Sequence, residues 1–187
     1  MKLIEKPFVF VRHGQTKLNA AGLIGGRTDS PLTSLGIEQA KQGAKQLNVA
    51  WSAVYASGLS RAQDTARYAV PKQEFIVHEG LNERDWGDLE ECPIAQLTPY
   101  EETPPNGEAW EGFEARVIGA LNDILAQHDW PLIVAHSGVH RVLNNHINGT
   151  PYGERIDNVA AKAFDPVSLE DNTPAIWLIS PYEGQNL

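Results

Sequence analysis

Cysteine is nearly absent from this chain of 187 residues, and long hydrophobic runs are missing. Because Cys92 is the single cysteine, an internal disulfide framework is excluded, and a reducing compartment is expected. No apolar run approaches the roughly 20 residues that a membrane-spanning helix needs. The first apolar run, residues 8–11, is too short for a cleaved signal peptide and leads directly into Arg12 and His13. Together these absences predict a cytoplasmic protein.

Linkers and repeats are missing as well. No Gly/Ser-rich or Pro-rich stretch divides the chain into parts, and no segment recurs at a fixed period. The hydrophobic fraction of 42% and the charged fraction of 21% are normal for a globular domain, and 187 residues can bury one good core. We therefore expect a single domain over residues 1–187.

Basic residues are absent between Asp85 and Ala115, where acidic residues gather. The whole chain has 15 basic and 24 acidic residues, which gives a net charge of −9. The stretch contains nine acids, enough to account for the excess: Asp85, Asp88, Glu90, Glu91, Glu101, Glu102, Glu108, Glu111 and Glu114. A net negative charge disfavours nucleic acid and anionic membrane surfaces as partners.

The most informative stretch that is present covers residues 8–16. Its first four residues are apolar and predict a strand buried on both faces of a sheet. Arg12 and His13 follow directly, and in open α/β sheets ligands bind just beyond the carboxyl ends of the strands. We therefore expect Arg12 and His13 to lie in a ligand site.

A second histidine follows a second predicted strand. Residues 131–135 are apolar and lead into His136, Ser137 and Gly138, after which the apolar spacing indicates a helix. If the two strands are parallel neighbours, His13 and His136 converge on one point, and the glycines allow the backbone to approach a ligand closely. Such a geometry suits an anion.

A third predicted strand, residues 53–57, leads into a helix whose first turn contains Arg61. The N-terminus of a helix has free N–H groups and a partial positive charge, so phosphate binds there readily. Arg61 would strengthen such a site.

Two long helices and two further strands complete the prediction of an α/β protein. Thr33 caps a helix that continues to about Leu47. Further strands are expected at residues 75–77 and 176–179. In the helix after Thr33, the positions expected to face the core are Leu35, Ala40, Ala44 and Leu47. A second long helix is expected from the helical spacing of Phe113, Val117, Leu121 and Ile124.

These motifs together resemble those of the histidine phosphatase superfamily, in the branch that contains cofactor-dependent phosphoglycerate mutases and many small-molecule phosphatases. Five pieces occur in order at family-like spacing: residues 12–19 (RHGQTKLN), 26–33 (GRTDSPLT), 55–66 (YASGLSRAQDTA), 81–84 (LNER) and 136–139 (HSGV). The resemblance implies a three-layer α/β sandwich with a largely parallel central sheet and helices on both faces.

The resemblance also implies a role for each of five catalytic residues. His13 would be the nucleophile that forms a phosphohistidine, since a neutral imidazole is nucleophilic without a metal. Arg12 and Arg61 would clamp the phosphoryl oxygens with paired guanidinium donors, and His136 would donate a further hydrogen bond. Glu83 would protonate the leaving-group oxygen and then activate the water that cleaves the phosphohistidine.

Substrate-lining positions of the family correspond to Arg12, Asn19, Gly26, Arg61 and Ser137. The chain departs from the usual family pattern at Gln15, Leu18, Gly58, Glu91 and Ser137. None of these departures removes a catalytic group, so they bear on the substrate and not on the phosphohistidine step. Thr16 stands where the acid phosphatase and phytase branch has an arginine, which argues against that branch.

The acidic stretch, residues about 85–112, resembles the variable insert that covers the active site in this family and shapes specificity. Four prolines interrupt regular structure there: Pro93, Pro99, Pro104 and Pro105. The alternative is a solvated, partly mobile loop. If the stretch lines the pocket, we expect it to repel a leaving group with extra negative charge, such as phosphoglycerate.

The predicted function is metal-independent hydrolysis of small phosphorylated metabolites through a phosphohistidine, with no cofactor. One alternative is a cofactor-dependent phosphoglycerate mutase, although the chain lacks the basic residues beyond Glu83 and the extra length of such mutases. Another is a catalytically silent protein that binds a phosphorylated ligand.

A metal site is the main competing chemistry, because His136 and His140 are four residues apart. Ser137 stands where the zinc-protease motif needs a glutamate, and no third ligand presents itself. We expect the remaining histidines to be ordinary surface or helix-end residues: His78, His128, His140 and His146.

Overall fold

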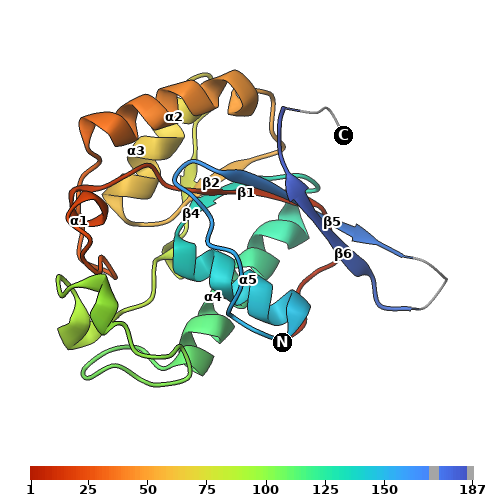
Figure 1. Ribbon diagram of the computed structural model, residues 1–187. Helices are drawn as coiled ribbons and strands as arrows, with labels where there is room; N and C mark the ends of the chain where they lie inside the picture. Colours follow the sequence, from red (N-terminus) through yellow and green to blue (C-terminus); the bar gives the residue numbers. More distant parts are fainter. Residues whose placement is uncertain (169–172, 185–187) are drawn as a thin grey trace.

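The structure, a computed structural model, describes residues 1–168 and 173–184. At its centre is a six-stranded sheet in the order β3-β2-β4-β1-β5-β6 (Figure 1). The strands are β1 (Phe8–Arg12), β2 (Val54–Ala56), β3 (Ile76–Val77), β4 (Leu132–Ala135), β5 (Ala161–Val167) and β6 (Ile176–Pro181). β1 to β4 run parallel, and β5 and β6 are joined antiparallel at one edge. The sheet is therefore largely parallel.

Helices cover both faces of the sheet, which makes a three-layer α/β sandwich (Figure 1). On one face lie α2 (Ser34–Leu47) and α3 (Ser60–Ala69), and on the other α4 (Trp110–Gln127) and α5 (Ser137–Asn148). The short helix α1 (Lys17–Ala20) follows β1. The predicted fold class is confirmed.

Two hydrophobic cores explain why β1 is a continuous apolar run. Successive side chains of a strand point to opposite faces. Val9 and Val11 accordingly pack in the core beneath α2 and α3, whereas Phe8 and Phe10 pack in the core beneath α4 and α5. Residues 8–11 of this strand are therefore all apolar, and its first polar side chain is Arg12 at the carboxyl end.

The predicted helix after Thr33 is correct in its position and partly wrong in its buried face. The Thr33 hydroxyl accepts a hydrogen bond from the Gly36 N–H at 3.0 Å and so caps α2. Ala40 and Leu47 are buried as expected, but Leu35 is 53% exposed. The reason is that the neighbouring Gly36 faces inward, where the backbone of Gln15 leaves no room for a side chain.

The strand β5 was not predicted from the sequence. Its residues include Lys162 and Pro166, and all but one are only half-buried, so no alternating apolar pattern marks it. Pairing defines the strand instead, because it lies between β1 and β6 with Val9 opposite Ala163. Register with β1 supplies what local sequence does not.

The segment between β3 and α4 contains three short 3-10 helices, which are η1 (Glu79–Leu81), η2 (Gly87–Leu89) and η3 (Ile94–Gln96). It is paired with the loop after α1: the Ile24 N–H donates to the Cys92 carbonyl at 2.9 Å, and the Glu91 N–H donates to the Ile24 carbonyl at 2.8 Å. Glu91 has a φ of 63°, a left-handed conformation that favours glycine.

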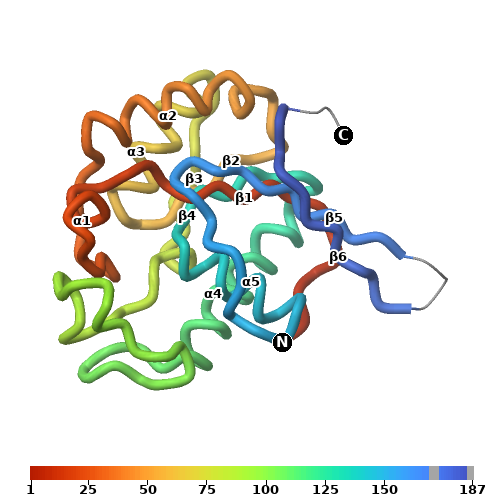
Figure 2. The backbone as a smooth tube through the Cα atoms, in the orientation of Figure 1, coloured from red at the N-terminus to blue at the C-terminus, as the bar shows by residue number. Residues whose placement is uncertain are grey.

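The topology brings together the chain segments that follow three parallel strands. β1, β2 and β4 are parallel neighbours, so their carboxyl ends lie together, as the backbone trace shows (Figure 2). His13, Ser57 and His136 are the next residues after these three strands. Within the described residues, no helix has both the length and the apolar character needed to cross a membrane.

Candidate active site

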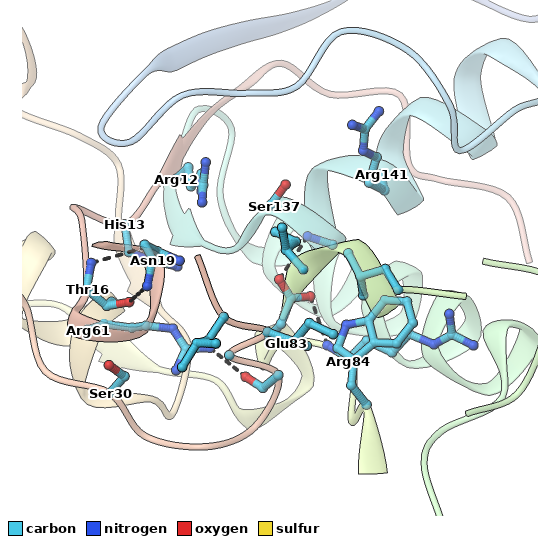
Figure 3. A pocket seen from close by; sticks show the side chains of 18 of the residues that line it. Arg12, His13, Thr16, Asn19, Ser30, Arg61, Glu83, Arg84, Ser137 and Arg141 are labelled. Atoms are coloured by element: carbon cyan, nitrogen blue, oxygen red, sulfur yellow. Dashed lines mark hydrogen bonds between the residues drawn. The ribbon is translucent and has the colours of Figure 1, made fainter. Parts of the chain in front are cut away.

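A cavity of about 220 Å³ opens at the carboxyl ends of β1, β2 and β4 (Figure 3). His136 lies behind the cavity and is fully buried, with its ring centroid 5.1 Å from that of His13. The other predicted site residues line the cavity: Arg12, His13, Asn19, Gly26, Arg61, Glu83 and Ser137. The fold thus gathers all the predicted site residues around one space.

His13 is held as a neutral ring with one unprotonated nitrogen. Its Nδ1 donates a hydrogen bond to the carbonyl of Gly14 at 2.7 Å, so Nε2 carries no proton in the neutral form. Burial, followed by the positive charges of Arg61 and Arg12, lowers the pKa of His13 well below its usual value of 6.5. The ring is therefore neutral at pH 7, and its Nε2 has a free electron pair.

Arg12 and Arg61 bring positive charge to His13. Arg12 Nη1 donates to the Ile156 carbonyl at 2.8 Å, while Arg61 donates to the carbonyls of Gly26 and Thr28 at 2.6 and 2.9 Å. Burial lowers the pKa of Arg12 to about 10, so the group still carries its charge at pH 7. The carbonyls orient both guanidinium groups without neutralising them.

Ser57 controls the orientation of His136. The Ser57 hydroxyl accepts a hydrogen bond from the Leu59 N–H at 3.3 Å and lies 2.6 Å from His136 Nε2, so its own proton is available to that nitrogen. This arrangement favours the tautomer with the proton on Nδ1. His136 Nδ1 is buried and has no hydrogen-bond partner. A buried donor without a partner next to His13 is suited to a ligand oxygen.

Glu83 is held at the N-terminus of α5. One carboxylate oxygen accepts the Gly138 N–H at 2.9 Å, and the other accepts the Arg84 N–H at the same distance. A side chain at position 138 would collide with the carboxylate, because a Cβ there would overlap Glu83 Oε1. Glycine at 138 therefore permits the close approach that places Glu83 in the cavity (Figure 3).

Sequence reasoning missed the residue that fixes the loop at Gly26. The Glu90 carboxylate accepts hydrogen bonds from the Arg27 and Thr28 N–H groups, each at 2.8 Å. Arg61 holds the carbonyls of the same loop, so the loop is gripped from both sides. Nothing in the local sequence distinguishes Glu90 from the eight other acids of residues 85–115.

Two arginines, Arg84 and Arg116, hold the backbone around Glu83. The Arg84 side chain is fully buried, with its guanidinium 4.6 Å from the ring centre of Trp86, and it donates to the Glu108 carbonyl at 3.0 Å. Arg116 forms an ion pair with Glu108 at 2.8 Å and donates to the Asn82 carbonyl at 3.0 Å. These contacts fix the backbone on either side of Glu83.

The acidic segment contributes apolar side chains, and not acidic ones, to the cavity. Trp86, Ile94, Leu97 and Tyr100 line it, whereas Glu83 is the single carboxylate among the lining residues of the described chain. Several acids of this segment are instead bound to partners elsewhere. Glu90 binds backbone N–H groups and Glu108 binds Arg116.

His136 and His140, the pair that suggested a metal site as the competing chemistry, belong to no metal-binding cluster among the described residues. His140 packs against Phe10 and Phe164, with ring centroids 5.9 and 6.4 Å away. Residues 1–168 and 173–184 contain no group of three or more His, Cys, Asp or Glu side chains placed to hold a metal ion.

A three-layer α/β fold with two histidines, two arginines and a carboxylate at the ends of its parallel strands defines a phosphate-binding class of protein. The model of the histidine phosphatase superfamily (branch 1) matches residues 8–169. The chain belongs to this superfamily, as its motifs predicted.

Relatives within the superfamily carry two kinds of description. A probable phosphoglycerate mutase GpmB of Proteus mirabilis is 36% identical over 164 residues, which cover 78% of this chain and 76% of that protein. A 2,3-bisphosphoglycerate-dependent phosphoglycerate mutase of Brucella ovis is 30% identical, with 78% and 83% covered. The solved structure of an alpha-ribazole phosphatase from Shigella flexneri has a TM-score of 0.78 at 29% identity, with 97% and 98% covered.

Proposed function

We propose that this protein is a metal-independent phosphatase that hydrolyses small phosphomonoesters through a phosphohistidine on His13. The observation that supports this most is the unprotonated Nε2 of a buried, neutral His13 between two charged arginines. The similarity to an alpha-ribazole phosphatase over nearly the whole of both chains favours hydrolysis.

In the first half-reaction, Nε2 of His13 attacks the phosphorus atom and the bond between phosphorus and the leaving-group oxygen breaks. The protonated Glu83 gives its proton to that oxygen, so the leaving group departs as an alcohol. Arg12, Arg61 and the Nδ1–H of His136 bind the phosphoryl oxygens. Because phosphoryl transfer depends mainly on positioning and on neutralising charge, these donors carry most of the catalysis.

In the second half-reaction, water replaces the leaving group. The Glu83 carboxylate accepts a proton from the water as its oxygen attacks phosphorus, and the bond between phosphorus and His13 breaks. Inorganic phosphate leaves, and Glu83 is again protonated. One carboxylate therefore serves as acid and then as base, which its position in the cavity allows.

The second candidate function is a phosphoglycerate mutase, which the curated relatives favour. The structure adds Arg141 and Arg155 to the lining of the cavity, so basic residues beyond Glu83 are available after all. The wall formed by the acidic segment argues in the other direction, because its apolar side chains match a small, highly polar glycerate poorly.

Residues about 85–112 are proposed to cover the active site within a single domain, because four of their side chains line the cavity. Asn19 and Ser137, which also line the cavity, are proposed to contact the substrate. Cytoplasmic location stays a prediction from the single cysteine.

Release of inorganic phosphate from 4-nitrophenyl phosphate in the presence of EDTA tests the proposal. Wild type should turn over, His13→Ala should lose activity by at least about a thousandfold, and Arg67→Gln, an exposed arginine outside the cavity, should behave as wild type. Efficient isomerisation of phosphoglycerate without hydrolysis would favour the mutase. No turnover of any ester, together with tight binding of phosphate, would favour a silent binding protein.

A further inference from the structure

The cavity contains more positive charge than one phosphoryl group requires. Five arginines line it, at positions 12, 61, 84, 141 and 155, and Glu83 is the single carboxylate among the lining residues of the described chain. This surplus occurs in a protein whose net charge is −9. Charge is therefore concentrated here against the overall balance of the molecule.

The arginines occupy different parts of the cavity. Arg12 and Arg61 adjoin His13, and Arg84 is enclosed behind the wall by Trp86 and Trp110. Arg141, on α5, lies well apart from Arg61 (Figure 3). Two of the five are thus placed at the phosphoryl group, and Arg141 is not.

Arg141 and Arg155 share a second polar region around Tyr100. Burial raises the pKa of the Tyr100 phenol, and the charges of Arg141 and Arg155 both oppose this shift, so each of the two arginines lies within electrostatic reach of Tyr100. Burial, followed by the charge of Arg155, lowers the pKa of Arg12, so Arg155 reaches the His13 end of the cavity as well. Arg141 Nη1 donates to the carbonyls of Pro151 and Gly153 at 3.2 and 2.8 Å, which fixes its position.

Among the described residues, neither Arg141 nor Arg155 forms an ion pair with an acid. The ion pairs of the described chain that involve arginine are those of Arg67 and Arg116. Both of those pairs are formed by residues that do not line the cavity. Arg141 and Arg155 are therefore available to an anionic group of a ligand.

Apolar side chains form a further part of the cavity lining. This apolar wall is formed by Leu23 and Ile24 from the loop after α1 and by Trp86, Ile94 and Leu97 from the acidic segment. The two strips are joined by backbone hydrogen bonds between residues 22–24 and 91–94. Such a wall favours a flat or bulky apolar body over a small sugar acid.

We propose that the substrate's leaving group has an apolar, preferably aromatic, body and a second anionic group that binds Arg141 and Arg155. This inference rests on the proposed phosphatase function and names the class of its substrate. It reverses the expectation from the sequence that an anionic leaving group would be repelled.

Two synthetic esters that differ only in charge test this. One is 3-(4-phosphonooxyphenyl)propanoate, and the other is its propanamide, in which two methylene groups insulate the phenol so that both leaving groups are equally reactive. Wild type should prefer the acid in kcat/KM by about tenfold, which corresponds to one charge-assisted contact. The preference should fall toward one in Arg141→Gln with Arg155→Gln, and persist in Arg67→Gln.

Arg155 is exposed, so the single variant Arg155→Gln should fold even if the double variant does not. It should reduce the preference for the acid in part. The affinities of the two esters for His13→Ala, measured by calorimetry, give the same preference without turnover. The inference is therefore tested independently of the proposed chemistry. Equal use of acid and amide by wild type would overturn it. So would a preference for the acid that the double variant retains in full.

Discussion

Burial determines the protonation of the histidines in this protein. His13 and His136 lie beside positive charge inside the molecule, and burial is the first cause that lowers the pKa of each. His140 has no role in the proposed chemistry, yet burial lowers its pKa to about 4. All three are therefore neutral in the folded protein at pH 7, and each makes the folded state harder to protonate than the unfolded chain.

This difference predicts that stability falls with acid. A histidine whose pKa drops on folding binds its proton more readily when unfolded, so the free energy of unfolding decreases as the pH falls from 6.5 toward the folded pKa. For His140 alone the loss is about 1.6 kcal/mol between pH 6.5 and 5. His140→Phe, which suits the surrounding Phe10 and Phe164, should reduce the loss by that amount in urea unfolding at the two pH values. An unchanged pH dependence would contradict the assignment.

At the scale of elements, α5 connects packing to chemistry. Its buried side places Val139, Val142 and Leu143 against the sheet, and its first turn offers the Gly138 N–H to Glu83. The helix N-terminus also favours a negative charge on the carboxylate during the second half-reaction. The same helix presents Arg141 to the cavity, one turn further on.

Gly138→Ala should therefore disturb Glu83 while leaving α5 folded. The new methyl group forces the carboxylate away, so kcat for alkyl phosphates, whose leaving groups need a proton, should fall by about a hundredfold or more. Activated aryl phosphates should be affected much less.

Gly119→Ala is the matched control, because nothing lies within 4 Å of its new Cβ in α4. It should keep wild-type kinetics and gain about 0.5–1 kcal/mol in stability. Equal losses on both classes of ester would show that Gly138 acts on something other than proton donation.

Those parts of the site that are contiguous in sequence could be predicted, and those assembled by the fold could not. His13 and Arg12 stand next to a strand, and His136 and Arg61 stand next to a strand or helix, so local patterns located them. Glu90, Arg116, Arg141 and Arg155 acquire their roles from contacts with distant segments. No local feature marks them. The strand β5 escaped for the same reason, since its pairing with β1 defines it.

At the scale of the whole molecule, the charge distribution separates two tasks. The acids of residues 85–115 give the protein its net negative charge, while several of them are used as partners for backbone N–H groups and for Arg116. Within the part of the chain that the structure describes, the arginines that line the cavity form no ion pair with these acids. The motifs predicted an anion-binding site despite the net negative charge, and the structure gathers five arginines around the cavity.

The central claim is that the His13 imidazole accepts the phosphoryl group, and trapping that intermediate tests it most directly. Wild type mixed with a ³²P-labelled monoester and quenched in alkali within milliseconds should carry a label that survives base, is released by acid and maps to residue 13. His13→Ala should carry none. An enzyme that hydrolyses the ester at full rate without a label on His13, or whose His13→Ala variant stays active, would contradict the account.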